Sequence, residues 1–147
     1  MAVRVLIADS SGVTRDIIRH HLECGGCEIV GETKTVEQAL NLFRTARPDV
    51  VMLDPGLNST DHGDPLKMFR TIREESPSTS VIVVSASRSP ETQRLFLREG
   101  ALDCVVEPFD SRGFENMWRK LSKIYPELDR RQPVMAGSAA GARAMRA

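Results

Sequence analysis

Four residues that could carry chemistry stand at the ends of predicted strands: Asp9, Asp54, Ser85 and Glu107. Carboxylates can act as nucleophiles or as oxygen ligands for a divalent cation, and the serine offers a hydroxyl. An acid at the end of a strand can equally be a helix cap or a solvated loop charge. Whether these groups act together depends on whether the fold brings the strand ends to one edge.

Short apolar runs rich in β-branched residues alternate with amphipathic segments along the chain, and each run predicts a strand. The predicted strands are Val3–Ala8, Glu28–Glu32, Val50–Leu53, Ser80–Ser85 and Asp103–Glu107. Capping signals mark the helices between them. Thr35 with Gln38 predicts a capping box, Ser89 predicts an N-cap, and Asp110 or Ser111 can begin the last helix.

The strict alternation predicts an α/β fold with a parallel sheet, helices on both faces and right-handed crossovers. In such folds ligands bind at the carboxyl ends of the strands, near the point where the strand order reverses. We therefore expect the four polar groups named above to converge on one edge of the sheet.

Length and composition suit a small globular protein. The 147 residues fit one domain over 1–125, followed by a flexible tail over 126–147 that is rich in alanine, glycine and arginine. Acidic and basic residues balance at 20 each, which indicates neither a nucleic-acid nor a membrane partner. The N-terminus does not resemble a secretory signal, so we expect a cytoplasmic protein.

The segment HHLECGGC brings His20, Cys24 and Cys27 close together in sequence and resembles half of a zinc site. A helix would place His20 and Cys24 on one face. The plainer interpretation is a helix that ends at the two glycines, followed by a thiol that enters the next strand as an apolar residue. A metal or redox sensor remains as a remote alternative.

The segments RVLIADSSGVTR, PDVVMLD, VIVVSAS and REGALDCVVEPF occur in an order and spacing that resemble the receiver domain of bacterial two-component response regulators. The resemblance covers about residues 3–124 and implies a flavodoxin-like sheet of five strands in the order 2-1-3-4-5, with five helices. It also implies that Asp54 accepts a phosphoryl group from a histidine kinase, and that the Ser85 hydroxyl turns toward that group.

The same resemblance implies Mg²⁺ bound by Asp9, Asp54 and the backbone carbonyl of Gly56. The family has a second acid after the first strand, whereas Ser10 stands there and can be only a weak ligand. The family also has a lysine that pairs with the phosphoryl oxygens, and Glu107 replaces it. Glu107 could serve as a substitute metal ligand, or it could be a surface acid in a pocket that is no longer used.

Two further departures from the family pattern lie near this pocket, beside one feature that matches it. Cys104 stands where the family has an aromatic switch residue on the fifth strand. The loop PGLNSTDHGDP after Asp54 is a few residues longer than usual, which is either surface variation or a change in kinase docking or phosphoryl lifetime. Pro108 is typical of the family, in which the preceding peptide bond is usually cis, so we expect a cis Glu107–Pro108 bond.

Three functions remain open at this point. The first is a single-domain receiver that contacts a partner protein through its fourth helix, fifth strand and fifth helix, with weak or no dependence on phosphate. The second is a conventional receiver that a histidine kinase phosphorylates at Asp54 with Mg²⁺. The enzymatic activity of such a receiver is at most its own phosphorylation and dephosphorylation. The third is the metal or redox sensor.

The expected partners are a histidine kinase or phosphorelay protein and a downstream protein. Homodimerisation is left open.

Overall fold

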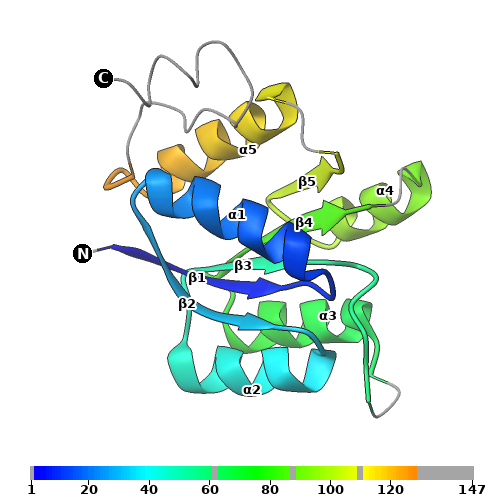
Figure 1. Ribbon diagram of the computed structural model, residues 1–147. Helices are drawn as coiled ribbons and strands as arrows, with labels where there is room; N and C mark the ends of the chain where they lie inside the picture. The colour runs from blue at the N-terminus through cyan, green and yellow to red at the C-terminus, as the bar shows by residue number, and fades with distance from the viewer. Residues whose placement is uncertain (1, 61–62, 87–88, 109–110, 129–147) are drawn as a thin grey trace.

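The computed structural model describes residues 2–60, 63–86, 89–108 and 111–128. Within these residues strands and helices alternate as predicted (Figure 1). The strands are β1 (Val3–Ala8), β2 (Cys27–Thr33), β3 (Val50–Leu53), β4 (Ser80–Ser85) and β5 (Asp103–Val106). The helices are α1 (Gly12–Cys24), α2 (Val36–Ala46), α3 (Pro65–Glu75), α4 (Pro90–Arg98) and α5 (Ser111–Ile124). The strands form a parallel sheet in the order β2-β1-β3-β4-β5, which confirms the predicted flavodoxin-like fold.

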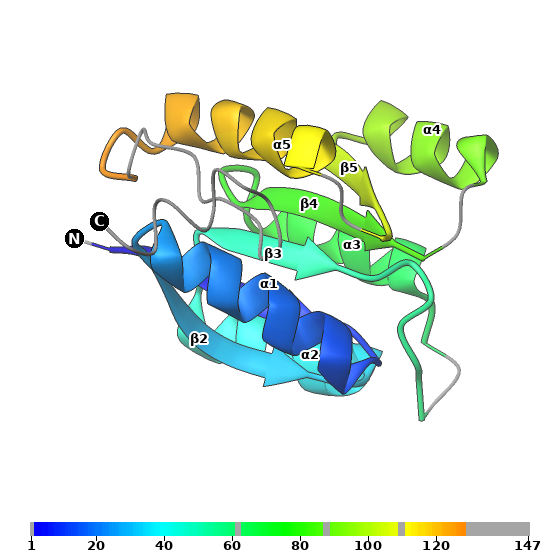
Figure 2. The same cartoon turned by 45° about the horizontal axis from the view of Figure 1, so that its top comes forward.

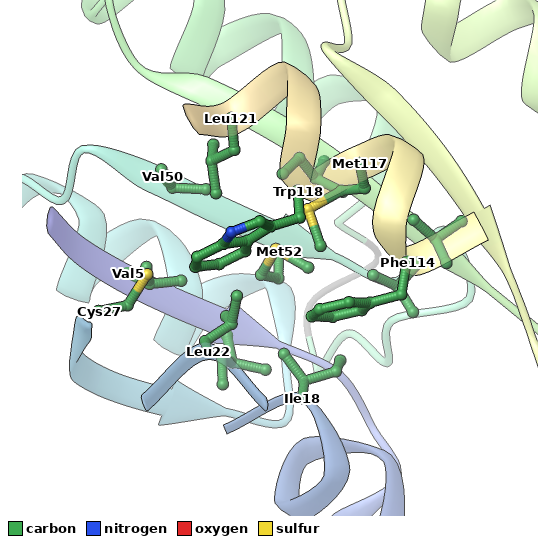
Figure 3. Close-up of a cluster of buried hydrophobic side chains, with 14 of the residues drawn as sticks. Val5, Ile18, Leu22, Cys27, Val50, Met52, Phe114, Met117, Trp118 and Leu121 are labelled. Atoms are coloured by element: carbon green, nitrogen blue, oxygen red, sulfur yellow. The ribbon is translucent and has the colours of Figure 1, made fainter. Parts of the chain in front are cut away.

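Apolar cores fill both faces of the sheet. Helices α1 and α5 cover one face, and α2, α3 and α4 cover the other (Figure 2). In the first core, Trp118 of α5 is fully buried in a cluster with Ile18 and Leu22 of α1 (Figure 3). In the second, the rings of Phe69 and Phe96 meet edge to face with centroids 5.4 Å apart. Because the central strands are covered on both faces, their sequences are continuous apolar runs.

The predicted capping residues begin the helices much as expected. The Thr35 hydroxyl accepts the backbone N–H of Gln38 at 3.2 Å. In turn, the side-chain Oε1 of Gln38 accepts the backbone N–H of Lys34 at 3.1 Å. Ser89 is the N-cap of α4. Helix α5 begins at Ser111, and the other predicted cap, Asp110, lies outside the described residues. These local bonds satisfy N–H groups that the first turn of a helix leaves unpaired.

Strand β2 is an outer strand of the sheet, paired only with β1, and it carries a β-bulge. Ile29 and Gly31 pair with consecutive residues of β1, which leaves Val30 as the extra residue. The glycine is required by a close approach, because a Cβ at Gly31 would collide with the side chain of Leu42 in α2. The missing side chain at Gly31 therefore leaves room for Leu42 of α2 against this strand.

The packed part of the chain continues past the predicted boundary at residue 126. The Tyr125 hydroxyl donates to the backbone carbonyl of Asp49 at 3.0 Å. Leu128 is only 2% exposed and belongs to the same core as Trp118. The predicted tail is thus anchored as far as Leu128, and its remaining residues, 129–147, lie outside the described part of the chain. A single leucine in a polar segment has no periodic pattern from which its burial could be predicted.

Candidate functional site

Asp54 follows the buried strand β3 and begins the loop that leads to α3. Its backbone N–H donates to the carbonyl of Ala8 in β1 at 2.9 Å, which continues the pairing of the two strands up to the loop. Its Oδ1 accepts the N–H of Gly56 at 2.7 Å, and its backbone carbonyl accepts the N–H of Leu57 at 3.0 Å. The residue is partly exposed, and within the described residues only Oδ1 of its carboxylate has a hydrogen-bond partner. The carboxylate is thus oriented through Oδ1 by the turn that follows it.

Asp9 follows β1 and is only 5% exposed. Its Oδ1 accepts the N–H of Ser11 at 2.8 Å. Burial raises the pKa of Asp9 from 3.8 to about 6; the Ser11 N–H opposes this, and the negative charges of Asp54 and Glu107 add to it. Asp54 and Glu107 therefore both lie within electrostatic reach of Asp9 at the carboxyl edge of the sheet, as the fold predicts.

Ser85 and Glu107 occupy the neighbouring part of this edge. Ser85 is the last residue of β4 and is 3% exposed, whereas Glu107 directly follows β5 and is partly exposed. The Glu107 N–H donates to the Ser85 carbonyl at 2.8 Å, which fixes the two backbones side by side. The Glu107–Pro108 peptide bond is cis, which confirms the expectation from the sequence.

Arg15 is a residue of this site that the sequence analysis missed. Its Nη1 donates to the backbone carbonyl of Asp9 at 2.6 Å, and its Nε lies 3.6 Å from Oε1 of Glu32. The side chain is 13% exposed, and its positive charge lowers the pKa of Asp9 against the effect of burial. Its position could have revealed it, because a residue in the first turn of α1 lies next to the strand end that precedes the helix.

Ser10, expected as a weak metal ligand, makes a different contact. Its Oγ accepts the backbone N–H of Asn58 at 3.1 Å, and the carbonyl of Asn58 accepts the N–H of Val36 at 2.8 Å. The loop after Asp54 is thereby bound both to the end of β1 and to the start of α2. The sequence predicts that this loop is longer than usual but does not indicate where it docks.

The oxygen donors at this edge are chemically suited to Mg²⁺. They are the carboxylates of Asp9, Asp54 and Glu107 and the backbone carbonyl of Gly56, and Mg²⁺ prefers such ligands. Nevertheless, in the part of the chain that the structure describes, no three His, Cys, Asp or Glu side chains are arranged to hold an ion.

The segment HHLECGGC does not form a metal site among the described residues. His20 and Cys24 do share one face of α1, with Nε2 and Sγ 3.9 Å apart, and Cys24 is exposed. Cys27 begins β2 and is buried in the core beside α1 and α5, where burial raises the pKa of its thiol to about 12. A protonated core thiol is a poor metal ligand, so the geometry does not support the metal or redox sensor.

The family model of the response regulator receiver domain matches residues 5–119. The chain therefore belongs to the response regulator receiver family, a class of proteins in two-component signalling. Its fold and the acids at the carboxyl edge of its sheet agree with that assignment. None of the helices in the described ranges has the length and apolar character to cross a bilayer.

Known relatives agree with this membership. The chain is 30% identical over 129 residues to the probable C4-dicarboxylate response regulator DctR of Halalkalibacterium halodurans, covering 82% of this chain and 55% of that protein. It is 27% identical over 126 residues to the chemotaxis protein CheY of Thermotoga maritima, covering 84% of this chain and all of CheY (100%). The crystal structure of NtrX from Brucella abortus superposes with a TM-score of 0.74 at 27% identity, over 84% of this chain and 28% of that chain. The chain thus spans about half of DctR and the full length of CheY.

Proposed function

We propose that this receiver signals by contact with a partner protein, with weak or no dependence on phosphorylation of Asp54. The observation that carries the proposal is the carboxylate of Glu107 at the edge that holds Asp54 and Asp9. In the family, a lysine at this position pairs with the phosphoryl oxygens. One charge pair at about 4 Å is worth roughly 4 kcal/mol at an effective dielectric near 20. Exchanging attraction for repulsion would therefore oppose the phosphoryl group by several kcal/mol before screening by solvent.

The environment of Asp9 supports this proposal. Its pKa is already raised to about 6 by burial and by the charges of Asp54 and Glu107, so a phosphoryl group would add negative charge where it is already unfavourable. Ser10 brings no charge in place of the second acid of the family. When bound, Mg²⁺ would supply the positive charge that offsets the phosphoryl oxygens, with Asp9, Asp54 and the Gly56 carbonyl as its ligands.

The surface proposed for partner binding consists of α4, β5 and α5. Leu97 of α4 is 42% exposed and Ile124 of α5 is 47% exposed, so apolar side chains are available there. Nζ of Lys120 in α5 lies 3.2 Å from Oδ1 of Asp103 in β5, so an ion pair connects two of the three elements. Cys104 is too small to act as the aromatic switch residue of the family. We infer that this surface keeps one conformation and binds a downstream protein or a phosphorelay protein in the cytoplasm.

The alternative is a conventional receiver that a histidine kinase phosphorylates at Asp54 with Mg²⁺. The partial exposure of Asp54 favours it, since a carboxylate oxygen could attack the phosphorus of a phosphodonor while the bond from phosphorus to the leaving atom of the donor breaks. Asp9 and Ser85 stand at the same edge, as the family requires. Enzymatic activity would then be limited to the receiver's own phosphorylation and dephosphorylation.

Intact-protein mass spectrometry decides between the two. Wild type, Asp54→Ala and Glu107→Lys are incubated with a small-molecule phosphodonor and Mg²⁺. The proposal expects no adduct on wild type and one phosphoryl adduct on Glu107→Lys, because the lysine restores the missing attraction. A single adduct on wild type that is absent from Asp54→Ala would instead establish the conventional receiver.

A further inference from the structure

Glu37, in the first turn of α2, holds the loop that follows Asp54. Its Oε1 accepts the backbone N–H of Thr60 at 2.5 Å and the Thr60 hydroxyl at 2.6 Å, and its Oε2 accepts the Ser59 hydroxyl at 2.8 Å. These hydrogen bonds, those of Thr60 first, lower the pKa of Glu37 and keep it ionised. We call Glu37, Ser59, Thr60 and Gly63 the loop clasp.

Gly63 closes the clasp. Its N–H donates to Oγ of Ser59 at 2.5 Å. A Cβ at this position would lie 2.8 Å from Oε2 of Glu37 and 3.0 Å from Oγ of Ser59, so one of them would have to shift. The missing side chain at Gly63 thus leaves room for the Glu37 carboxylate beside the loop.

A chain of contacts connects the clasp to Asp54. Asn58 is bound through its carbonyl to α2 and through its N–H to Ser10. Leu57 is 4% exposed, belongs to the core beneath α2 and α3, and donates its N–H to the carbonyl of Asp54. Gly56 donates its N–H to the Asp54 carboxylate. The backbone from Asp54 to the clasp is thus held at nearly every residue.

We propose that Glu37 is a positioning residue for Asp54. The loop runs from Asp54 to Asp64 between β3 and α3, and a loop of this length has many conformations and would hold its first turn loosely without further contacts. The clasp restricts those conformations. It thereby keeps the turn in which the Gly56 N–H donates to Oδ1 of Asp54. The inference rests on the proposed function only in taking Asp54 as the central acid of the site.

Amide hydrogen exchange measured by NMR on the full chain tests this inference. In Glu37→Ala, exchange at Thr60 and Gly63 should rise by at least about tenfold, and exchange at Gly56 and Leu57 should rise with it. Glu37→Gln should have a smaller effect, because its carbonyl oxygen can still accept both bonds from Thr60. Faster exchange at Thr60 and Gly63 alone would overturn the inference, since the clasp would then not act on Asp54.

Glu91→Ala is a matched control. Glu91 is also a first-turn glutamate, in α4, and shows no hydrogen bond or ion pair in the described residues. Its replacement should leave exchange at Gly56 and Leu57 unchanged. Amides within β1 and β3 report the global stability of each variant. If they exchange faster in Glu37→Ala by the same factor as Gly56, the role of Glu37 is merely structural and the inference fails.

A double-mutant cycle provides a second test that does not depend on Glu37→Ala alone. Gly63→Ala should speed exchange at Leu57 in the wild-type background by colliding with the Glu37 carboxylate. In the Glu37→Ala background the same substitution should have a clearly smaller effect. Additive effects would show that the two residues do not form one unit and would refute the clasp. Mass spectrometry decides the proposed function and exchange decides the clasp, so either can fail alone.

Discussion

Replacing Asp9 by asparagine should stabilise the protein at neutral pH. In the folded state Asp9 is 5% exposed, and burial together with the charges of Asp54 and Glu107 raises its pKa from 3.8 to about 6. At pH 7 the folded protein must therefore keep an unfavourable buried charge. Asparagine removes that charge, and its side-chain carbonyl can still accept the N–H of Ser11.

The magnitude follows from the shift in pKa. A change from 3.8 to about 6 corresponds to about 3 kcal/mol of unfolding free energy, taken as an order of magnitude. A raised pKa means that the folded state binds the proton more tightly than the unfolded chain does. The stability from this group is thus fully present below pH 3.8 and is lost as the pH rises through about 6. Asp9→Asn should gain up to about 3 kcal/mol at pH 7 and little at pH 4.

Urea denaturation of both proteins between pH 4 and pH 8 measures this difference. Only the difference between wild type and variant is interpreted, because other titrating groups cancel from it. Asp49→Asn is the control, since Asp49 also accepts a backbone N–H through its carboxylate but lies at the opposite edge of the sheet. A difference that does not change with pH, or a variant less stable than wild type at pH 7, would refute the assigned electrostatics.

Three further predictions concern individual side chains. Glu107→Gln should lower the pKa of Asp9, because the substitution removes one of the two negative charges that raise this pKa. An NMR titration of the Asp9 carboxyl group measures the change, and an unchanged pKa would mean that the two side chains lie too far apart to interact. At pH 8 a thiol reagent should modify the exposed Cys24 much faster than Cys27, whose pKa is raised to about 12 by burial; equal rates would contradict that burial. Leu128→Ala should reduce the unfolding free energy by about 2–5 kcal/mol in urea denaturation, and a loss below about 0.5 kcal/mol would mean that the residue is not packed in solution.

Much of the fold was predictable because its strands and helices carry strong local patterns. Strand β3 is predicted at the same residues that the structure shows, since a four-residue apolar run buried on both faces has no polar member to obscure it. Strand β2 is one residue longer at each end than predicted, because Cys27 and Thr33 are buried yet are not typical apolar strand residues. Thr35 and Ser89 could be recognised as caps because capping depends on neighbours three residues away.

The contacts that define the candidate site were harder to predict because they join distant residues. Ser10 and Asn58 are separated by 48 positions, and neither residue type indicates which distant group it will bind. Glu37 has the appearance of an ordinary first-turn acid, and its partners lie in a loop without periodicity. The convergence of Asp9 and Asp54 could be predicted because parallel strands end at a common edge, which is a property of the fold and not of these two residues.

The bulge in β2 also bears on how copies of the protein meet. An exposed edge strand offers unpaired N–H and C=O groups that can recruit a strand from another molecule, and bulges and charged side chains prevent this. Val30 interrupts the regular spacing of those groups, while Glu28 on the same strand is exposed and negatively charged. A second copy that approached this edge would meet a distorted hydrogen-bond ladder and like charges. Self-association by extension of the sheet through β2 is therefore disfavoured.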